Sequence, residues 1–189
     1  SIHYTNNLMV NNSCFYRKYV FAEDSPKNRA TALIINKAIQ QPFFTEMRTN
    51  QQLGYIVWSY LRNLDETIYL NFLIQSGEYS ADELNKRANS FIAGAFELLS
   101  SMDEDTYQKL IESSIEEIEK RPMSISERAS KLKSLIFEHD VDYERDKKTI
   151  ESLKQLTKTE VVEKLEIVTS EKSRKMLNIC ILYTSDAAD

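Results

Sequence analysis

The chain has 189 residues, of which 42% are hydrophobic and 28% charged, with only three glycines and three prolines. This length suits one globular domain with a sizeable core, because domains commonly run to about 100–200 residues. The scarcity of glycine and proline excludes low-complexity disorder, argues against many short strands joined by tight turns, and favours long helices. The net charge of −5 and the scattered basic residues argue against a nucleic-acid partner, which needs clustered lysine and arginine.

The cysteines and the chain ends leave the localisation open. Cys14 and Cys180 lie in apolar, strand-like runs, where two buried free thiols are expected and a disulfide between neighbouring strands is the alternative. No run approaches the ~18–20 apolar residues of a membrane span, and no signal peptide is visible. The chain starts at Ser1, and residues 182–189 resemble translated sequencing-adapter read-through. We therefore expect one domain over residues 1–181, cut from a longer protein, and a non-native tail.

The first elements predicted are a strand and two helices. Residues with high β-propensity are concentrated between positions 13 and 21. Ser25 and Pro26 then indicate an N-cap followed by a first-turn proline. Pro42 is expected to break that helix, and a short second helix is expected over about 43–51.

A hairpin is predicted next. Gly54 is expected to end the short helix as a C-cap, after which the chain turns into a strand. Two β-rich runs, 55–61 and 67–75, are expected to pair through a five-residue loop. Both runs mix large apolar residues on each face, as expected for a sheet mostly covered by helices.

The second half of the chain predicts long helices with well-marked starts. A serine or threonine followed three residues later by glutamate occurs four times, each time before an apolar stripe. The four N-cap candidates are Ser80, Ser101, Ser124 and Thr157. A further helix is expected over 142–153, and residues 175–183 read as an apolar strand in the centre of the sheet. This order predicts an α+β fold, with helices packed on one face of a mainly antiparallel sheet.

Most catalytic devices are excluded by the residues present. The two histidines, His3 and His139, have no second histidine at helical spacing, so no metal site is expected in this chain. His139 is better explained as a polar loop residue. No nucleophile elbow accompanies the serines, and the three glycines lie too far apart for a phosphate-binding loop. The acidic residues between positions 112 and 119 alternate with apolar ones, as a solvated helix face does.

The stretch RTNQQLGY, from Arg48 to Tyr55, is the remaining candidate for chemistry. Arg48 lies near the end of an expected helix and Tyr55 at the start of a strand, so a sharp reversal at Gly54 could bring both side chains to one rim. Arginine supplies a fixed charge and tyrosine a hydroxyl donor, and together they could stabilise charge developing on a carbonyl oxygen. On spacing alone, the alternative is an arginine paired with a local acid and a tyrosine packed in the sheet.

The segment FFTEMRTNQQLGYIVWS, residues 43–59, resembles the last domain of the pitrilysin/insulinase family of zinc metalloendopeptidases. That domain carries an arginine, a threonine, two polar residues and Gln-Leu-Gly-Tyr leading into a strand. The run ending in Ile74-Gln75-Ser76 and the helix beginning at Leu156-Thr157 also match, so the resemblance covers most of residues 13–181. It implies the metallohydrolase-like domain type found in pitrilysin and the mitochondrial processing peptidases, with four such domains around a chamber.

The resemblance also implies a function. In the family, zinc is bound in the first domain by an H-x-x-E-H helix and a downstream glutamate. Arg48 and Tyr55 then correspond to the last domain's pair, which faces the zinc, holds the substrate backbone and polarises the scissile carbonyl. The implied partners are a peptide or small polypeptide and the N-terminal domains of the same protein, and this chain alone would be inactive. Two departures from the family are Asn50-Gln51, where many relatives have Lys-Glu, and the hairpin loop.

Two alternatives to a peptidase domain stay open. One is a noncatalytic scaffold, as in relatives whose zinc motif has decayed; retention of Arg48 and Tyr55 speaks against it. The other is a free-standing interaction domain, which leaves the Arg–Tyr spacing unexplained. An upstream reading frame that encodes H-x-x-E-H would decide in favour of the peptidase.

Overall fold

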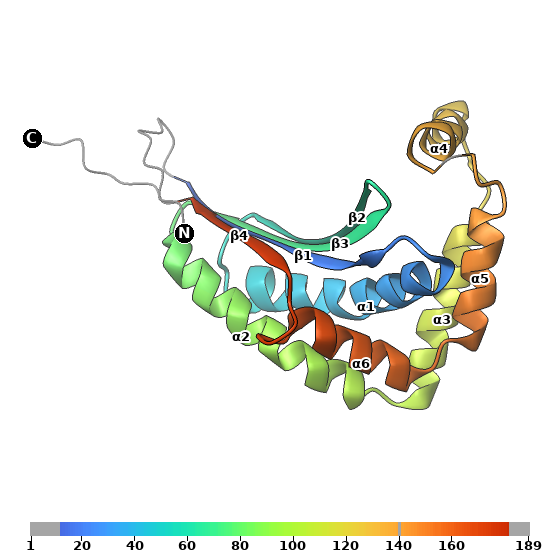
Figure 1. The fold of residues 1–189 in the computed structure, drawn as a ribbon. Coiled ribbons are helices and arrows are strands. Elements are labelled where there is room, and N and C mark those ends of the chain that lie inside the picture. Colours follow the sequence, from blue (N-terminus) through green and yellow to red (C-terminus); the bar gives the residue numbers. More distant parts are fainter. Residues whose placement is uncertain (1–11, 140, 182–189) are drawn as a thin grey trace, which may run out of the picture.

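The computed structural model describes residues 12–139 and 141–181, and within them one four-stranded antiparallel sheet has the order β2-β3-β1-β4 (Figure 1). The strands are β1 (Ser13–Glu23), β2 (Ile56–Leu64), β3 (Thr67–Ser76) and β4 (Met176–Ile181). The helices are α1 (Pro26–Phe44), α2 (Ala81–Ser100), α3 (Glu104–Glu119), α4 (Ile125–Glu138), α5 (Arg145–Gln155) and α6 (Lys158–Thr169). A π-helical segment, η1 (Thr45–Asn50), follows directly after α1. The predicted α+β class is confirmed; the proposed non-native tail, 182–189, lies outside the described residues.

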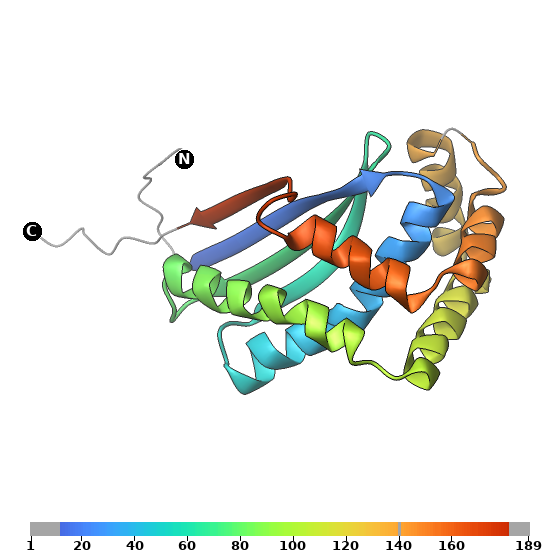
Figure 2. The same ribbon diagram turned by 60° about the horizontal axis from the view of Figure 1, so that its bottom comes forward.

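The core lies between the sheet and the helices α1, α2 and α6, which cover one of its faces (Figure 2). Side chains of β1 alternate between buried and half-buried, as expected for a sheet with one covered face. Phe72 of β3 packs edge-on against Tyr19 and Phe43, with ring centroids 6.2 and 5.1 Å away. Burial of these rings supplies a large apolar area to the core.

The other face of the sheet is not covered by the described helices. It carries Trp58 and Tyr60 of β2, which are paired with Leu73 and Asn71 of β3. Trp58 is 56% exposed. The predicted arrangement, with helices packed on one face of a mainly antiparallel sheet, is therefore confirmed.

Helix α1 does not end at Pro42, so the predicted break is wrong. The helix runs on to Phe44 and continues as η1, although Pro42 is inside it. A proline removes only one helical hydrogen bond, and packing can offset that loss. Here Phe43 and Met47, on either side of the junction, are fully buried.

Two other boundaries differ from the prediction. The hairpin turn is two residues long, not five, because Asp65 and Glu66 both adopt positive φ, 47° and 56°, as tight hairpin turns require. Ser101 is the C-cap of α2, and Asp103 is the residue that caps α3 by accepting from the Thr106 amide. The other three predicted N-caps are confirmed.

Strand β4 is an edge strand and not, as predicted, a central one. It pairs with β1 alone in the observed strand order, and five of its six residues are exposed. An apolar run predicts a strand but does not tell an edge from a centre. Cys14 and Cys180 are free, as predicted, but both are partly exposed, and burial raises the pKa of each thiol.

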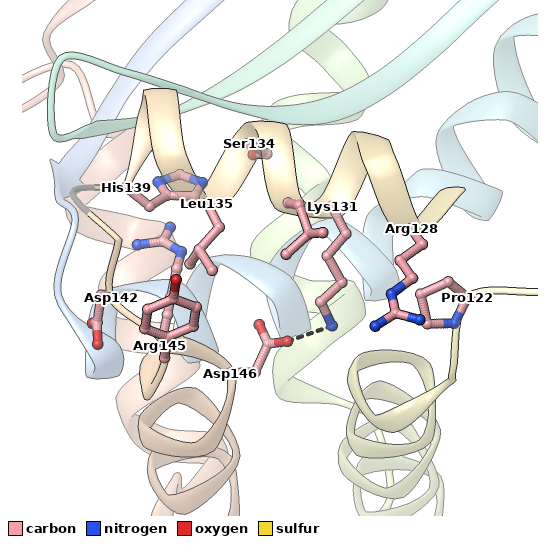
Figure 3. A pocket seen from close by; sticks show the side chains of 11 residues that line it. Pro122, Arg128, Lys131, Ser134, Leu135, His139, Asp142, Arg145 and Asp146 are labelled. Carbon is pink, nitrogen blue, oxygen red and sulfur yellow. Dashed lines mark ion pairs between the residues drawn. The ribbon is translucent and has the colours of Figure 1, made fainter. Parts of the chain in front are cut away.

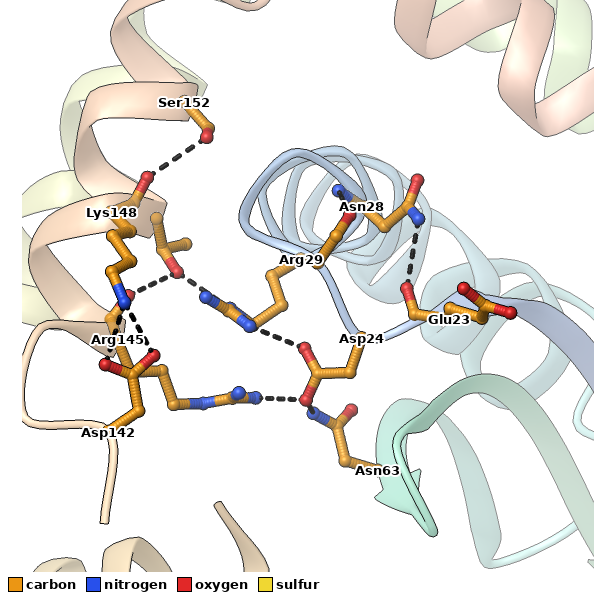
Figure 4. A network of polar contacts seen from close by, with 11 residues as sticks. Glu23, Asp24, Asn28, Arg29, Asn63, Asp142, Arg145, Lys148 and Ser152 are labelled. Carbon is orange, nitrogen blue, oxygen red and sulfur yellow. Dashed lines mark hydrogen bonds and ion pairs between the residues drawn. The ribbon is translucent and has the colours of Figure 1, made fainter. Parts of the chain in front are cut away.

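A charged cluster around Asp24 ties α5 to the rest of the fold (Figure 4). Asp24 follows β1 and accepts hydrogen bonds from Arg29 of α1 at 2.7 Å, Arg145 of α5 at 2.6 Å and Asn63 of β2 at 3.0 Å. Burial alone would raise the pKa of Asp24, but the bonds from Arg145 and Arg29 outweigh it and hold that pKa below its usual value. The Arg29 guanidinium also donates to Thr149 of α5 at 2.9 Å.

Candidate active site

Arg48 is presented on the last turn of η1 with its side chain exposed. The turn is held in place by Met47 and Leu53, both fully buried. The Leu53 amide bonds to the Met47 carbonyl at 2.9 Å, which closes the segment into a compact loop. The backbone that carries Arg48 is therefore anchored in the core while the guanidinium faces outward.

Gly54 lies where the chain reverses, but it is not a left-handed C-cap as predicted. The positive φ in this stretch belongs to Gln52, at 53°, and no described glycine has one. What Gly54 provides is close approach: a Cβ at this position would overlap the carbonyl oxygen of Gln75 in β3. The absence of a side chain lets the turn pack directly on the neighbouring strand.

Arg48 and Tyr55 are brought to the same turn. Nη1 of Arg48 donates to the carbonyl oxygen of Gly54 at 2.5 Å, and Gly54 immediately precedes Tyr55. Tyr55, directly before β2, is 56% exposed. The guanidinium is thus bonded to the backbone next to the tyrosine, and both side chains reach solvent.

The polar residues beside Arg48 are tied to one another. Glu46 accepts hydrogen bonds from Asn50 and Gln51, each at 2.7 Å, and these bonds hold the pKa of Glu46 below its usual value. Gln51 also accepts from Arg87 of α2 at 3.2 Å. Asn50 and Gln51, the departure from the family pattern, therefore stabilise the turn by binding Glu46.

Zinc does not fit the part of the chain that the structure describes. No group of three histidine, cysteine, aspartate or glutamate side chains there could hold a metal ion. Nor is any described helix long and apolar enough to cross a membrane. The candidate site offers a cation, Arg48, and a hydroxyl, Tyr55, both able to donate hydrogen bonds.

An aromatic and polar cluster on the open face of the sheet was not predicted from the sequence. Asn71 is fully buried there and accepts from the hydroxyl of Tyr16 at 2.8 Å. Lys18 lies 3.6 Å from the centre of the Tyr69 ring. Trp58 and Tyr60 lie two residues apart on β2 and therefore on the same face of the strand, and this spacing could have indicated an exposed aromatic face.

Comparison with known proteins identifies the family of this chain. The family model for the PQQ synthase PqqF-like C-terminal lobe, domain 4, matches residues 34–133, which include Arg48 and Tyr55. The chain belongs to the pitrilysin/insulinase family. Mouse insulin-degrading enzyme is 30% identical over 155 residues, covering 81% of this chain and 15% of that protein. Escherichia coli protease 3 is 25% identical over 134 residues, covering 71% and 14%.

Solved structures of this family share the fold. Pitrilysin superposes with a TM-score of 0.84 at 20% identity, covering 97% of this chain and 20% of that one. An inactive peptidase domain from Bordetella parapertussis superposes with a TM-score of 0.67 at 10% identity, covering 95% and 98%. The chain spans about a seventh of the length of the two curated relatives, mouse insulin-degrading enzyme and Escherichia coli protease 3.

Proposed function

We propose that this chain is the C-terminal, substrate-positioning domain of a zinc metalloendopeptidase. It would close the catalytic chamber and hold a peptide or small polypeptide opposite a zinc site carried by an N-terminal domain of the same protein. The observation that carries the proposal is the bond from the exposed Arg48 to the carbonyl of Gly54, the residue before the exposed Tyr55. Family membership supports the reaction class.

The two side chains would act on the substrate carbonyl. A guanidinium offers five N–H donors, and its bond to Gly54 uses one of them, so the group is oriented and can still donate to substrate. The Tyr55 hydroxyl, on the residue that follows Gly54, would be a second donor. Two donors that meet the oxygen as it gains charge stabilise the transition state more than the ground state. When bound in the N-terminal domain, zinc would supply the activated water.

The test is made in the full-length enzyme. Arg48→Ala and Tyr55→Phe should each lower kcat by about 10²–10³-fold, the loss typical for one donor to a developing oxyanion. Zinc content per enzyme molecule should stay at the wild-type value, because neither residue binds metal in the proposal. Lys109→Ala, an exposed lysine on α3, and Tyr143→Phe, an exposed tyrosine, are the matched controls. Near-normal turnover in both test variants would show that Arg48 and Tyr55 do not act on the substrate carbonyl.

The alternative is a noncatalytic scaffold domain. The fold itself is compatible with it, since an inactive peptidase domain of a putative zinc protease from Bordetella parapertussis has the same fold. A scaffold predicts that the upstream reading frame lacks H-x-x-E-H and that the parent protein binds no zinc. Intact Arg48 and Tyr55 would then be without function.

A further inference from the structure

Arg29 carries an unused hydrogen-bond donor in a poorly solvated place. Its side chain is only 10% exposed. Nη1 donates to Asp24 (Figure 4) and Nε donates to Thr149, whereas Nη2 has no hydrogen-bond partner. Within residues 12–139 and 141–181, it is the one buried side-chain nitrogen or oxygen without a partner. Leaving a buried donor unpaired is costly, so an acceptor that reaches Nη2 would stabilise the fold.

The Arg29 guanidinium borders a cavity of about 230 Å³. Residues of α1, α3, α5 and the strands β2 and β3 line this cavity, and Thr149 of α5 is one of them. In a planar guanidinium, the Nε–H and one Nη2–H point the same way. Because Nε donates to Thr149 at 2.9 Å, the unpaired Nη2 is directed toward the same side of the cavity.

The rest of the cavity wall is largely apolar. Leu33 of α1, Leu61 of β2 and Ile118 of α3 are partly buried there, and Ala32 and Ile68 are fully buried. A ligand that fits this space must therefore combine an acceptor with an apolar part. The volume is below the ~300–1,000 Å³ of pockets that take drug-sized ligands, so the occupant must be small.

The charges around the cavity favour an anion. Arg29 and Arg145 share a single carboxylate, that of Asp24, which leaves one positive charge over. Asp146 also lines the cavity, but its carboxylate is 2.6 Å from Nζ of Lys131 (Figure 3). A surplus positive charge and an unpaired guanidinium N–H together are suited to a carboxylate, since charge-assisted hydrogen bonds are the strong ones.

We propose that this cavity binds a small carboxylate with an apolar chain. One carboxylate oxygen accepts from Nη2 of Arg29, and the chain lies against Leu33, Leu61 and Ile118. A free short-chain acid and the C-terminal residue of a peptide both have this chemistry. The site goes beyond the proposed function, because Arg29 lies near the start of α1 whereas the Arg48–Tyr55 turn follows its end.

The test is a saturation-transfer NMR titration of the full-length enzyme with hexanoate. Wild type should bind hexanoate at least about tenfold more tightly than hexanol, which has no charge, and than acetate, which has no chain. Inorganic phosphate probes the charge alone. N-acetylleucine, compared with its amide, represents the C-terminal residue of a peptide.

Two variants remove the site in different ways. Arg29→Lys keeps a cation beside Asp24 but lacks the second donor, and should weaken hexanoate binding at least about tenfold. Leu33→Glu places a carboxylate four residues after Arg29 on the same helix face, where it takes the ligand's place and should abolish binding. Leu177→Glu on β4, 52% exposed in wild type, is the matched control and should bind hexanoate as wild type does.

Thermal unfolding provides a second measure and shows that the variants are folded. Hexanoate should raise the unfolding temperature of wild type and of the β4 control, because a ligand that binds only the folded state stabilises it. It should leave the unfolding temperature of Leu33→Glu unchanged.

The outcomes separate this site from its alternatives. Hexanoate binding in Arg29→Lys and Leu33→Glu as tight as in wild type overturns the proposal. Equal affinity for hexanoate, acetate and inorganic phosphate also overturns it, because such a site would recognise charge alone. Tighter binding of N-acetylleucine than of hexanoate assigns the site to a peptide terminus, and the reverse assigns it to a free acid. Binding is measured without turnover, so failure here is distinguishable from failure of the catalytic proposal.

Discussion

Gly54 is the residue on which the geometry of the candidate site depends most directly. Gly54→Ala would drive its Cβ into the backbone of Gln75, so the turn must shift. We expect a loss of about 2 kcal/mol in the free energy of unfolding, as overpacking commonly costs, and reduced turnover in the full-length enzyme because the Gly54 carbonyl anchors Arg48. Urea unfolding and peptide hydrolysis measure the two effects. Gly94→Ala on α2 is the control: no atom lies near its added Cβ, and the chain should gain about 0.5–1 kcal/mol.

At the same scale, the sequence pointed to Arg48, Gly54 and Tyr55 as one turn but not to the contacts that hold that turn. The spacing of Arg48 and Tyr55 and the reversal between them were predictable, because a glycine between a helix and a strand indicates a turn. The contact of Gly54 with Gln75 was not predictable, since it joins the turn before β2 to β3, and the register of these two strands emerges only in the folded sheet. Gln52 takes the positive φ that the pattern assigned to Gly54.

Helix α6 tests how local signals stabilise an element. Thr157 and Glu160 form a complete capping box, with each side chain bonded to the other's amide. Glu160 also accepts from Lys27 at 2.7 Å. Thr157→Ala should lower the free energy of unfolding by about 1 kcal/mol, whereas Thr157→Ser keeps the hydroxyl and should stay near wild type. Equal losses in both variants, in urea unfolding, would assign the effect to the methyl group and not to the cap.

The same carboxylate predicts a pH dependence. Hydrogen bonds from Lys27 and Thr157 lower the pKa of Glu160 to about 2. Because folding lowers the pKa of Glu160, its carboxylate stabilises the folded state. This stabilisation is fully present above the pKa of the unfolded chain, about 4.3, and is lost as the pH falls toward 2. The difference in unfolding free energy between wild type and Glu160→Gln should therefore be constant from pH 5 to 7 and shrink at pH 3. A difference that grows on acidification would contradict this assignment.

Elements were predictable where their cause is local. Three of the four predicted N-caps hold because a side chain and an amide three residues away decide them. At Ser101 the pattern failed because Asp103, two residues on, caps α3 instead. Pro42 and β4 failed for another reason: the burial of Phe43 and Met47 and the place of a strand in a sheet depend on distant residues.

At the scale of the whole molecule, Asp24 connects three parts that are far apart in the sequence. Its carboxylate is bonded to α1, to β2 and to α5 through Arg29, Asn63 and Arg145. Because α5 is the next helix after α4, this cluster (Figure 4) holds the end of the domain from which α4 projects (Figure 1). The two ends of the domain thus have separate supports: buried apolar side chains under the Arg48–Tyr55 turn, and a nearly buried charge cluster under α5.

Asp24→Asn should therefore destabilise the domain globally while leaving the candidate site locally intact. The side chain of Asp24 is only 7% exposed, and those of Arg29 and Arg145 are 10% and 15% exposed, so the substitution leaves two cations without their carboxylate in a poorly solvated place. Breaking such a pair costs about 3 kcal/mol. Asp65→Asn, at the exposed positive-φ position of the hairpin turn, is the control and should change stability by less than about 0.5 kcal/mol. Urea unfolding at pH 7 measures both variants, and amide exchange locates the effect: α5 should open more readily in Asp24→Asn, and η1 should not. Faster exchange in η1 than in α5 would show that the cluster supports the site and not the helical end.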